Sequence, residues 1–221
     1  MSFNQILLNQ LYEHKLMCIF RVNEIETSRL VKAAQACVDG GARFIEITYN
    51  HEAYEDKTLE VVKAIKEQLK DKAYVGVGTV LNLREALRVH EAGADFIVAP
   101  TLNLEVLTYA KDHQLFYMPG VFTATEAYEA YAHGVEMVKL FPTGEIGLDY
   151  ALALMKPMGF IKYFAVGKMT PEFYEDCLKA GFAGAGVSSS INQKDILMKD
   201  DFDLICQKVK HYVEISDKYK S

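Results

Sequence analysis

Short apolar runs alternate with longer amphipathic stretches along the whole chain. The runs are rich in Val, Ile, Phe and Tyr, and they recur at intervals of roughly twenty to thirty residues. Apolar runs of this length, each followed by a helix-like pattern, are typical of repeated strand–helix units. We therefore predict eight strands, at Leu16–Arg21, Arg43–Thr48, Tyr74–Gly78, Phe96–Ala99, Phe116–Pro119, Met137–Phe141, Lys162–Val166 and Ala183–Val187.

Helix boundaries are marked between these runs. Thr123 followed by Glu126 predicts a capping box, and Thr170 before Pro171 predicts an N-cap followed by a proline in the first turn. A glycine three residues before a strand predicts a helix that ends in the left-handed conformation. Four glycines have this spacing: Gly41, Gly93, Gly134 and Gly181.

Eight such units favour a closed (β/α)8 barrel of the α/β class, formed as a single domain over residues 1–221. Two further helices are predicted, an N-terminal one at Ser2–His14 and a C-terminal one at Asp201–Ser216. An open nucleotide-binding sheet would bring a glycine-rich turn after its first strand. The residues that follow Arg21 contain no glycine, which argues against that alternative.

Composition narrows the classes of partner. The formal net charge is -6, and acidic and basic residues are mixed along the chain, which argues against nucleic acid as a partner. The segment Ser2–His14 mixes polar residues with its leucines and does not resemble a signal peptide. No apolar run approaches membrane-spanning length. We expect a cytoplasmic protein without a membrane partner.

The cysteines and histidines are scattered. Neither type shows the close spacing that zinc sites use, so we expect buried free thiols and no metal. The four cysteines are Cys18, Cys37, Cys177 and Cys206.

Two charged residues stand inside apolar strands. Because residues two apart share one face of a strand, Glu46 lies on a face with Thr48 and Asn50, and Lys139 lies between apolar neighbours. One interpretation is an ion pair inside the barrel, or a residue that faces solvent at a strand end. The other is catalytic: a desolvated lysine has a lowered pKa and attacks ketones, while a neighbouring carboxyl moves protons.

Other strand ends carry further candidates. Arg21 ends the first strand and is either a cation for an anionic substrate or a solvated arginine. Thr79 ends the third strand and is either a substrate contact or the N-cap of the next helix. The turns after strands seven and eight, with Gly167–Lys168 and Ser188–Ser189, are either phosphate-binding turns or only tight turns.

Six segments together resemble the KDPG/KHG aldolase family (2-keto-3-deoxy-6-phosphogluconate and 4-hydroxy-2-oxoglutarate aldolases), in matching order over nearly the whole chain. The lysine strand ending in Lys-x-Phe-Pro and the Glu-x-Thr strand fall on the sixth and second units, as in that family. The segments are Phe44–Thr48, Val75–Leu81, Ile97–Pro100, Met118–Gly120, Val138–Pro142 and Phe164–Gly167.

The resemblance implies a class I aldolase, a homotrimer with no metal or organic cofactor, that acts on a small 2-oxo acid. Its substrates would be 2-keto-3-deoxy-6-phospho sugar acids, cleaved to pyruvate and glyceraldehyde 3-phosphate, or 4-hydroxy-2-oxoglutarate. By position, Lys139 matches the Schiff-base lysine, Glu46 the acid/base and Thr79 a residue near the pyruvate carboxylate. Pro100 and Phe141 lie in matching motifs and are further candidate substrate contacts. Phe141, Met137 and Phe122 are expected to keep the site dry.

The chain departs from the family at positions that affect the substrate. Asn50 stands where the gluconate-type enzymes have arginine, and Asn50, Val166 and Arg21 resemble the phosphogalactonate branch. Lys168 and Ser188 each replace a glycine in the phosphate turns. Lys168 either adds a cation to a phosphate site, or it crowds that site and the substrate lacks the phosphate.

Two other classes of protein fit the same barrel. A phosphosugar isomerase or epimerase would use Glu46 as a base without forming an imine. A non-catalytic barrel that binds sugar acids would bind ligand without turnover.

Overall fold

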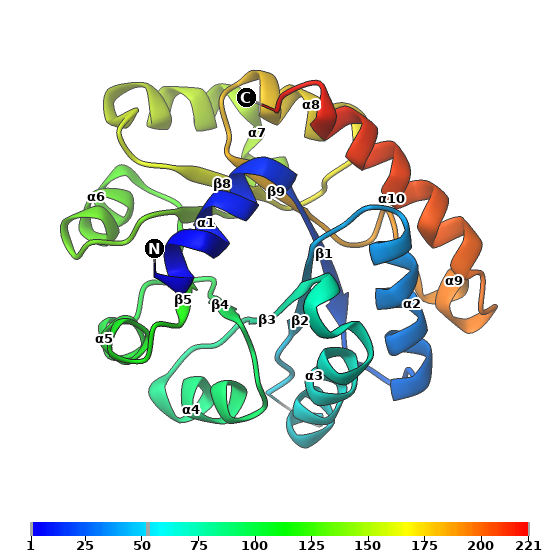
Figure 1. Cartoon of the computed structure of the whole chain (residues 1–221). Helices are drawn as coiled ribbons and strands as arrows, with labels where there is room; N and C mark the ends of the chain where they lie inside the picture. The colour runs from blue at the N-terminus through cyan, green and yellow to red at the C-terminus, as the bar shows by residue number, and fades with distance from the viewer. Residues whose placement is uncertain (1, 52–53, 221) are drawn as a thin grey trace.

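The strands form one parallel sheet that closes into a barrel, shown by a computed structural model that describes residues 2–51 and 54–220 (Figure 1). The strand order is β5-β4-β3-β2-β1-β9-β8-β7-β6. Its two ends, β5 (Phe116–Met118) and β6 (Gly120–Val121), are separated in the chain only by Pro119, so they act as one interrupted strand. The predicted (β/α)8 barrel is therefore confirmed.

The remaining strands and the helices alternate as predicted. The other strands are β1 (Leu16–Arg21), β2 (Phe44–Thr48), β3 (Tyr74–Gly78), β4 (Phe96–Val98), β7 (Val138–Leu140), β8 (Tyr163–Val166) and β9 (Gly184–Val187). The α-helices are α1 (Phe3–His14), α2 (Thr27–Asp39), α3 (Glu55–Leu69), α4 (Leu83–Glu91), α5 (Leu104–Asp112), α6 (Ala124–Ala132), α7 (Thr143–Met155), α8 (Pro171–Lys179), α9 (Lys194–Met198) and α10 (Phe202–Asp217). Two short 3-10 helices, η1 (Lys70–Lys72) and η2 (Lys156–Met158), follow α3 and α7.

The fifth strand differs most from the prediction. We expected one strand at Phe116–Pro119, but Pro119 interrupts it because proline has no backbone N–H to donate. The Pro119 carbonyl instead accepts a hydrogen bond of 2.8 Å from the backbone N–H of Lys139. The interruption therefore fixes the backbone at the lysine strand.

The predicted helix caps are present. Thr123 and Glu126 form both bonds of a capping box, and Thr170 caps α8 ahead of Pro171. All four glycines predicted to end helices have positive φ angles. The alternative that Thr79 is an N-cap is wrong, because Asn82 caps α4.

Two apolar layers surround the barrel wall. The outer layer lies between the strands and the ring of helices, and the inner layer fills the barrel. Helix α1 contributes Leu7, Leu8 and Leu11 to the inner layer, where they pack with Met17 and Phe44. In Figure 1, α1 crosses the end of the barrel that faces the viewer. One end of the barrel is thus plugged, and the carboxyl ends of the strands lie on the opposite face.

Several expectations about composition can be compared with the described residues. All four cysteines are free thiols; three are buried, and Cys206 is half-buried. Among residues 2–51 and 54–220, no cluster of His, Cys, Asp or Glu could hold a metal ion. None of the helices in these ranges is both long enough and apolar enough to span a membrane.

Candidate active site

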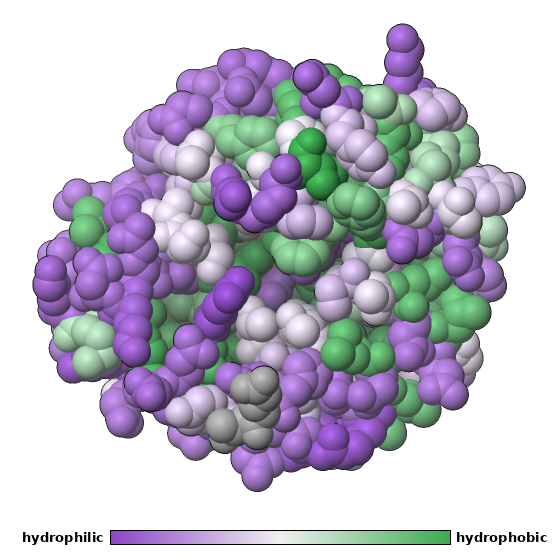
Figure 2. Space-filling model, turned by 180° about the vertical axis from the view of Figure 1, so that it is seen from behind, coloured by the Kyte–Doolittle hydropathy of each residue, from purple (hydrophilic) through white to green (hydrophobic). Residues whose placement is uncertain are grey.

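A cavity of about 420 Å³ opens at the carboxyl ends of the barrel strands. This is the face seen in Figure 2, which is viewed from the side opposite to Figure 1 and is hollowed near its centre. The cavity brings together ten predicted site residues from six different strands or strand ends. They are Arg21, Glu46, Thr79, Lys139, Phe141, Val166, Gly167, Lys168, Ser188 and Ser189.

Glu46 and Lys139 are almost completely buried in this cavity, with exposed fractions of 3 % and 6 %. Each lies on an inward-facing position of its strand, Glu46 in β2 and Lys139 in β7. They do not form a direct ion pair, and the Glu46 Oε2 atom has no hydrogen-bond partner among the described residues. The predicted ion-pair interpretation is therefore wrong in its simple form, and an unpaired acceptor faces the interior.

Burial shifts the pKa values of both groups towards their neutral forms. It lowers the pKa of Lys139 below its ordinary value, and the nearby Glu46 carboxylate opposes this shift. Burial raises the pKa of Glu46, and Lys139, Thr48 and Arg21 oppose this shift. The Arg21 cation also lowers the pKa of Lys139 by repulsion. Both pKa shifts therefore favour the uncharged forms, a free amine on Lys139 and a protonated carboxyl on Glu46.

The closest packing around Glu46 involves Gly78, the last residue of β3. A Cβ atom at position 78 would overlap the Glu46 carboxyl group, so only glycine leaves room for that carboxyl. Phe141 packs from the other direction, with the Lys139 Nζ atom 4.7 Å from the centroid of its ring. Gly78 therefore leaves room for the Glu46 carboxyl group, and the Phe141 ring lies next to the Lys139 Nζ atom.

The turns after β8 and β9 form one side of the cavity. Gly167 and Lys168 both have positive φ angles, at 123° and 42°. The Lys168 ammonium lies 3.8 Å from the Glu145 carboxylate, and its side chain is 71 % exposed. Among the described residues, the backbone amide groups of Lys168 and Ser189 donate no hydrogen bond. This side offers a cation and amide donors to an anionic group of a ligand.

The cavity also includes polar residues that the sequence reasoning missed. Asn23, Asn192, Gln193 and Lys194 line it from the loops after β1 and β9. Asn192 donates a hydrogen bond of 2.6 Å to the Ile19 carbonyl and so ties the β9 loop to β1. None of these residues interrupts an apolar strand, so the signal that identified Glu46 and Lys139 was absent.

Four predicted residues lie outside this lining. Asn50 donates a hydrogen bond of 3.1 Å to the Val22 carbonyl and lines an adjoining recess that shares Arg21 with the cavity. The Pro100 carbonyl packs against Gly120. Phe122 is 42 % exposed and stacks on Tyr150 outside the barrel, and Met137 is buried in the inner layer. The expectation that Phe122 covers the site is therefore wrong, because its side chain points outward.

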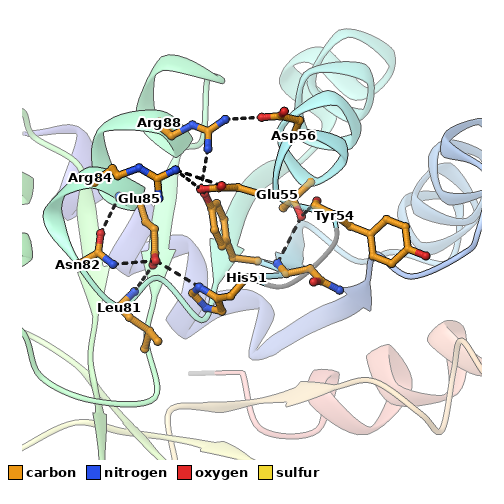
Figure 3. Close-up of polar contacts among 12 residues, drawn as sticks. His51, Tyr54, Glu55, Asp56, Leu81, Asn82, Arg84, Glu85 and Arg88 are labelled. Atoms are coloured by element: carbon orange, nitrogen blue, oxygen red, sulfur yellow. Dashed lines mark hydrogen bonds and ion pairs between the residues drawn. The ribbon is translucent and has the colours of Figure 1, made fainter.

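A polar network holds Thr79 at the edge of the cavity. The two ring nitrogens of His51 contact the Thr79 carbonyl, at 3.0 Å, and the Glu85 carboxylate, at 3.2 Å. Figure 3 shows Glu85 accepting hydrogen bonds from Leu81 and Asn82 as well, both at 2.7 Å. Thr79 has a φ angle of 61°, which a β-branched residue rarely adopts. The network therefore holds a strained backbone that presents Thr79 to the cavity.

A separate group of contacts ties the start of α3 to α4. Glu55 pairs with Arg84 at 2.9 Å and with Arg88 at 2.6 Å, and it accepts a hydrogen bond from the Tyr49 hydroxyl. Arg88 also pairs with Asp56 (Figure 3). The first turn of α3, which follows the loop after β2, is thus anchored on the helix that follows Thr79.

Comparisons with known proteins identify the family of the chain. The family model for KDPG and KHG aldolase matches residues 7–208. The chain is 33 % identical to the 2-dehydro-3-deoxy-6-phosphogalactonate aldolase of Escherichia coli K12, over 81 % of this chain and 86 % of that protein. It is 31 % identical to the KHG/KDPG aldolase of the same organism, over 83 % of this chain and 84 % of that one.

Solved structures give the same result. A structure described as native KDPGal superposes with a TM-score of 0.81 at 30 % identity, and the match covers 92 % of this chain and 95 % of that one. A 4-hydroxy-2-oxoglutarate/2-dehydro-3-deoxyphosphogluconate aldolase superposes with a TM-score of 0.80 at 27 % identity, covering 94 % and 97 %. Because the family model, the relatives and the fold agree, the chain belongs to the KDPG and KHG aldolase family, whose members are carbon–carbon lyases.

Proposed function

We propose that this chain is a class I aldolase that cleaves a 2-keto-3-deoxy-6-phospho sugar acid into pyruvate and glyceraldehyde 3-phosphate. The observation that carries the proposal is the burial of Lys139 and Glu46 in one cavity without a direct ion pair. Relatives that act on phosphogalactonate-type and phosphogluconate-type acids support this substrate class. Membership of an aldolase family favours this reaction over the isomerase and the non-catalytic barrel.

The reaction begins with Lys139 and proceeds without a change of oxidation state in the protein. The neutral amine of Lys139 attacks the C2 ketone, and Glu46 gives a proton to the departing hydroxyl, which leaves as water. The product is an iminium. Glu46, through a water molecule, then removes the C4 hydroxyl proton while the C3–C4 bond breaks, and the iminium receives the electron pair as an enamine. Protonation at C3 and hydrolysis release pyruvate and restore the amine.

The other lining residues would bind the two ends of the substrate. Thr79 would contact the pyruvate carboxylate, and Arg21 at the end of β1 would add a cation to the cavity. The turns at Gly167–Lys168 and Ser188–Ser189 would receive the phosphate at the opposite end of the substrate. A cytoplasmic location and the lack of nucleic-acid and membrane partners stay predictions from the sequence.

A second candidate substrate is 4-hydroxy-2-oxoglutarate, which carries a carboxylate in place of the sugar phosphate. The surroundings of Lys168 support this second substrate. The Glu145 carboxylate lies 3.8 Å from the Lys168 ammonium and would repel a dianionic phosphate bound there. One relative is named for both activities.

We further propose that the protein is a homotrimer, as the family resemblance implies. An exposed aromatic patch on α6, α7 and the loops nearby supports association between copies. Tyr131 and Phe160 contact each other at 4.7 Å between ring centroids, and Phe122 and Tyr150 stack at 5.6 Å. All four side chains are between 39 % and 51 % exposed.

The first prediction concerns the two reacting side chains. Incubation with pyruvate and sodium borohydride should add one reduced pyruvyl group at Lys139, and Lys139→Met should abolish both labelling and cleavage. Glu46→Gln should lower turnover by about a hundredfold or more but still allow some imine to be trapped, since it removes only proton transfer. Peptide mass mapping locates the label, and a coupled assay for pyruvate measures turnover. Labelling at another lysine would contradict the mechanism.

The second prediction concerns the charge of Arg21. Because Arg21 lowers the pKa of Lys139, Arg21→Gln should raise that pKa and leave less neutral amine at a given pH. The rate of imine formation rises with pH as the amine loses its proton, so the rise should move to higher pH in the variant. Borohydride trapping at saturating pyruvate across a pH series measures the shift. Arg29→Gln on α2 is the matched control, and equal shifts in both variants would rule out a local effect of Arg21.

The third prediction decides between the two roles of Lys168. If Lys168 contacts the phosphate, Lys168→Gly should raise KM for 6-phosphorylated substrates by roughly ten- to a hundredfold, the loss of a charge-assisted hydrogen bond. If Lys168 obstructs the site, the same variant should gain activity on those substrates. Non-phosphorylated analogues should change little in either case. Equal kinetics of both enzymes on both substrates would make Lys168 a surface residue and refute both roles.

The fourth prediction tests the oligomer. The double substitution Tyr131→Arg/Phe160→Arg should yield monomers, because like charges would meet across an interface that uses this patch. Multi-angle light scattering after gel filtration measures the mass. Leu87→Arg on α4, an exposed leucine away from the patch, should leave the mass unchanged. A wild-type monomer, or a trimeric double variant, would rule out this patch as the interface.

A further inference from the structure

A larger cavity, of about 770 Å³, lies at the amino end of the barrel, away from Lys139. Its wall includes Tyr163 and Ala183, at the starts of β8 and β9, and Tyr12 and Lys15 at the end of α1. The ends of α7 and α8 and the C-terminal Tyr219 complete it. Figure 1 shows α1, α7, α8 and the C-terminus meeting at this end of the barrel. The volume lies within the usual range for small-molecule sites.

Charge in this cavity has one sign. Three lysines line it, Lys15, Lys156 and Lys162, and no aspartate or glutamate is among the lining residues. None of the three ammonium groups takes part in an ion pair or hydrogen bond within residues 2–51 and 54–220, whereas Lys66, on the outer surface, is paired with Asp95. Lys15 is half-buried, and this burial lowers the pKa of its ammonium group. Three uncompensated cations around one cavity favour an anion there.

A buried hydroxyl group provides an independent observation. Tyr163 is only 2 % exposed, and its hydroxyl has no hydrogen-bond partner among the described residues. The neighbouring buried tyrosines do have partners, since the Tyr174 hydroxyl contacts Ser216 and the Tyr212 hydroxyl donates to the Met169 carbonyl. Buried polar groups are normally paired, so this phenol lacks an acceptor. Because less than 1 Å² of the hydroxyl is accessible, a ligand in the cavity would accept its hydrogen bond only by displacing part of the wall beside it.

The rest of the wall is apolar. Leu152, Met155, Ile161, Leu178 and Phe182 line the space between the lysines. A small inorganic ion would leave these side chains in contact with water, whereas a ligand with an apolar body would cover them. The lysines and the apolar wall together therefore favour a ligand with an anionic group and an apolar body.

We propose that this cavity is a binding site for an amphipathic organic anion, a small molecule with an apolar or aromatic body and a carboxylate, phosphate or sulfonate head. The head lies among Lys15, Lys156 and Lys162 and accepts a hydrogen bond from Tyr163. The body covers the apolar wall. The site is separate from the aldolase cavity, because Tyr163 and Val166 stand at opposite ends of β8.

The test uses 8-anilinonaphthalene-1-sulfonate as the probe, with binding measured by fluorescence titration. Its neutral counterpart, N-phenyl-1-naphthylamine, has the same aromatic body without the sulfonate and should bind at least tenfold more weakly. Lys15→Gln/Lys162→Gln should weaken binding of the sulfonate by about tenfold or more, since it removes two charge-assisted contacts. Lys32→Gln/Lys63→Gln, which removes two exposed lysines on α2 and α3, is the matched control and should leave the affinity unchanged.

Tyr163→Phe gives the sharper result, because it removes one oxygen atom and no charge. It should weaken sulfonate binding by about three- to tenfold, the loss of one neutral hydrogen bond. The unliganded variant should keep or raise its melting temperature, since the wild-type hydroxyl has no protein partner to lose. A crystal soaked with the probe should show density between Lys15 and Lys162.

Three outcomes would overturn the proposal. They are equal affinity for the two probes, equal loss of affinity in the cavity variant and in its control, or density for the probe only elsewhere. A lower melting temperature of unliganded Tyr163→Phe would show that the hydroxyl has a structural role instead. None of these results depends on aldolase activity, so the proposal and the proposed function fail separately.

Discussion

The site depends on keeping one amine and one carboxyl out of water without pairing them. A buried ion pair would satisfy both charges and leave neither group reactive, since each would hold the other in its charged form. Here burial favours the neutral forms, while the remaining attraction between Lys139 and Glu46 limits both shifts. Burying these two groups costs free energy, because β2 and β7 lie in a wall whose inner and outer layers are otherwise apolar.

Several features of the fold follow from that requirement. Helix α1 closes the amino end with leucines, and the cavity that contains the reacting groups opens at the carboxyl end. Gly78 gives the Glu46 carboxyl a position that any side chain would fill. Pro119 interrupts the fifth strand beside Lys139 and offers its carbonyl to the lysine backbone. The polar network around His51 and Glu85 lies outside this dry region and fixes the backbone of Thr79 from behind.

The features that could be predicted from the sequence are those that follow a regular residue pattern, such as the alternation of side chains in a strand. The alternation of side chains along a strand placed Glu46 and Lys139 inside the barrel, and glycine and capping patterns marked the helix ends. The same rule misplaced Asn50, because β2 ends at Thr48 and the alternation does not continue into the loop. Asn23 and Asn192 had no such signal, since loop residues reach a site through backbone turns that have no period. Thr79 was ambiguous for a related reason: the sequence does not show that α4 begins later, with Asn82 as the cap.

The cavity also changes character along its length. Around Lys139 and Glu46 it is dry, whereas Lys168 and Lys194 at the other side are exposed and paired with Glu145 and Glu24. Imine formation needs the dry end, because desolvation favours the neutral form of the lysine. An anionic tail needs the opposite, since moving a phosphate dianion into the same dry environment would cost far more than a few amide contacts return. At the rim, Glu145 and Glu24 offset part of the charge of these two lysines. Close to Lys139, a further cation would lower the pKa of that lysine and a further anion would raise it. Reactivity and substrate binding are thus separated by solvent exposure within a single cavity.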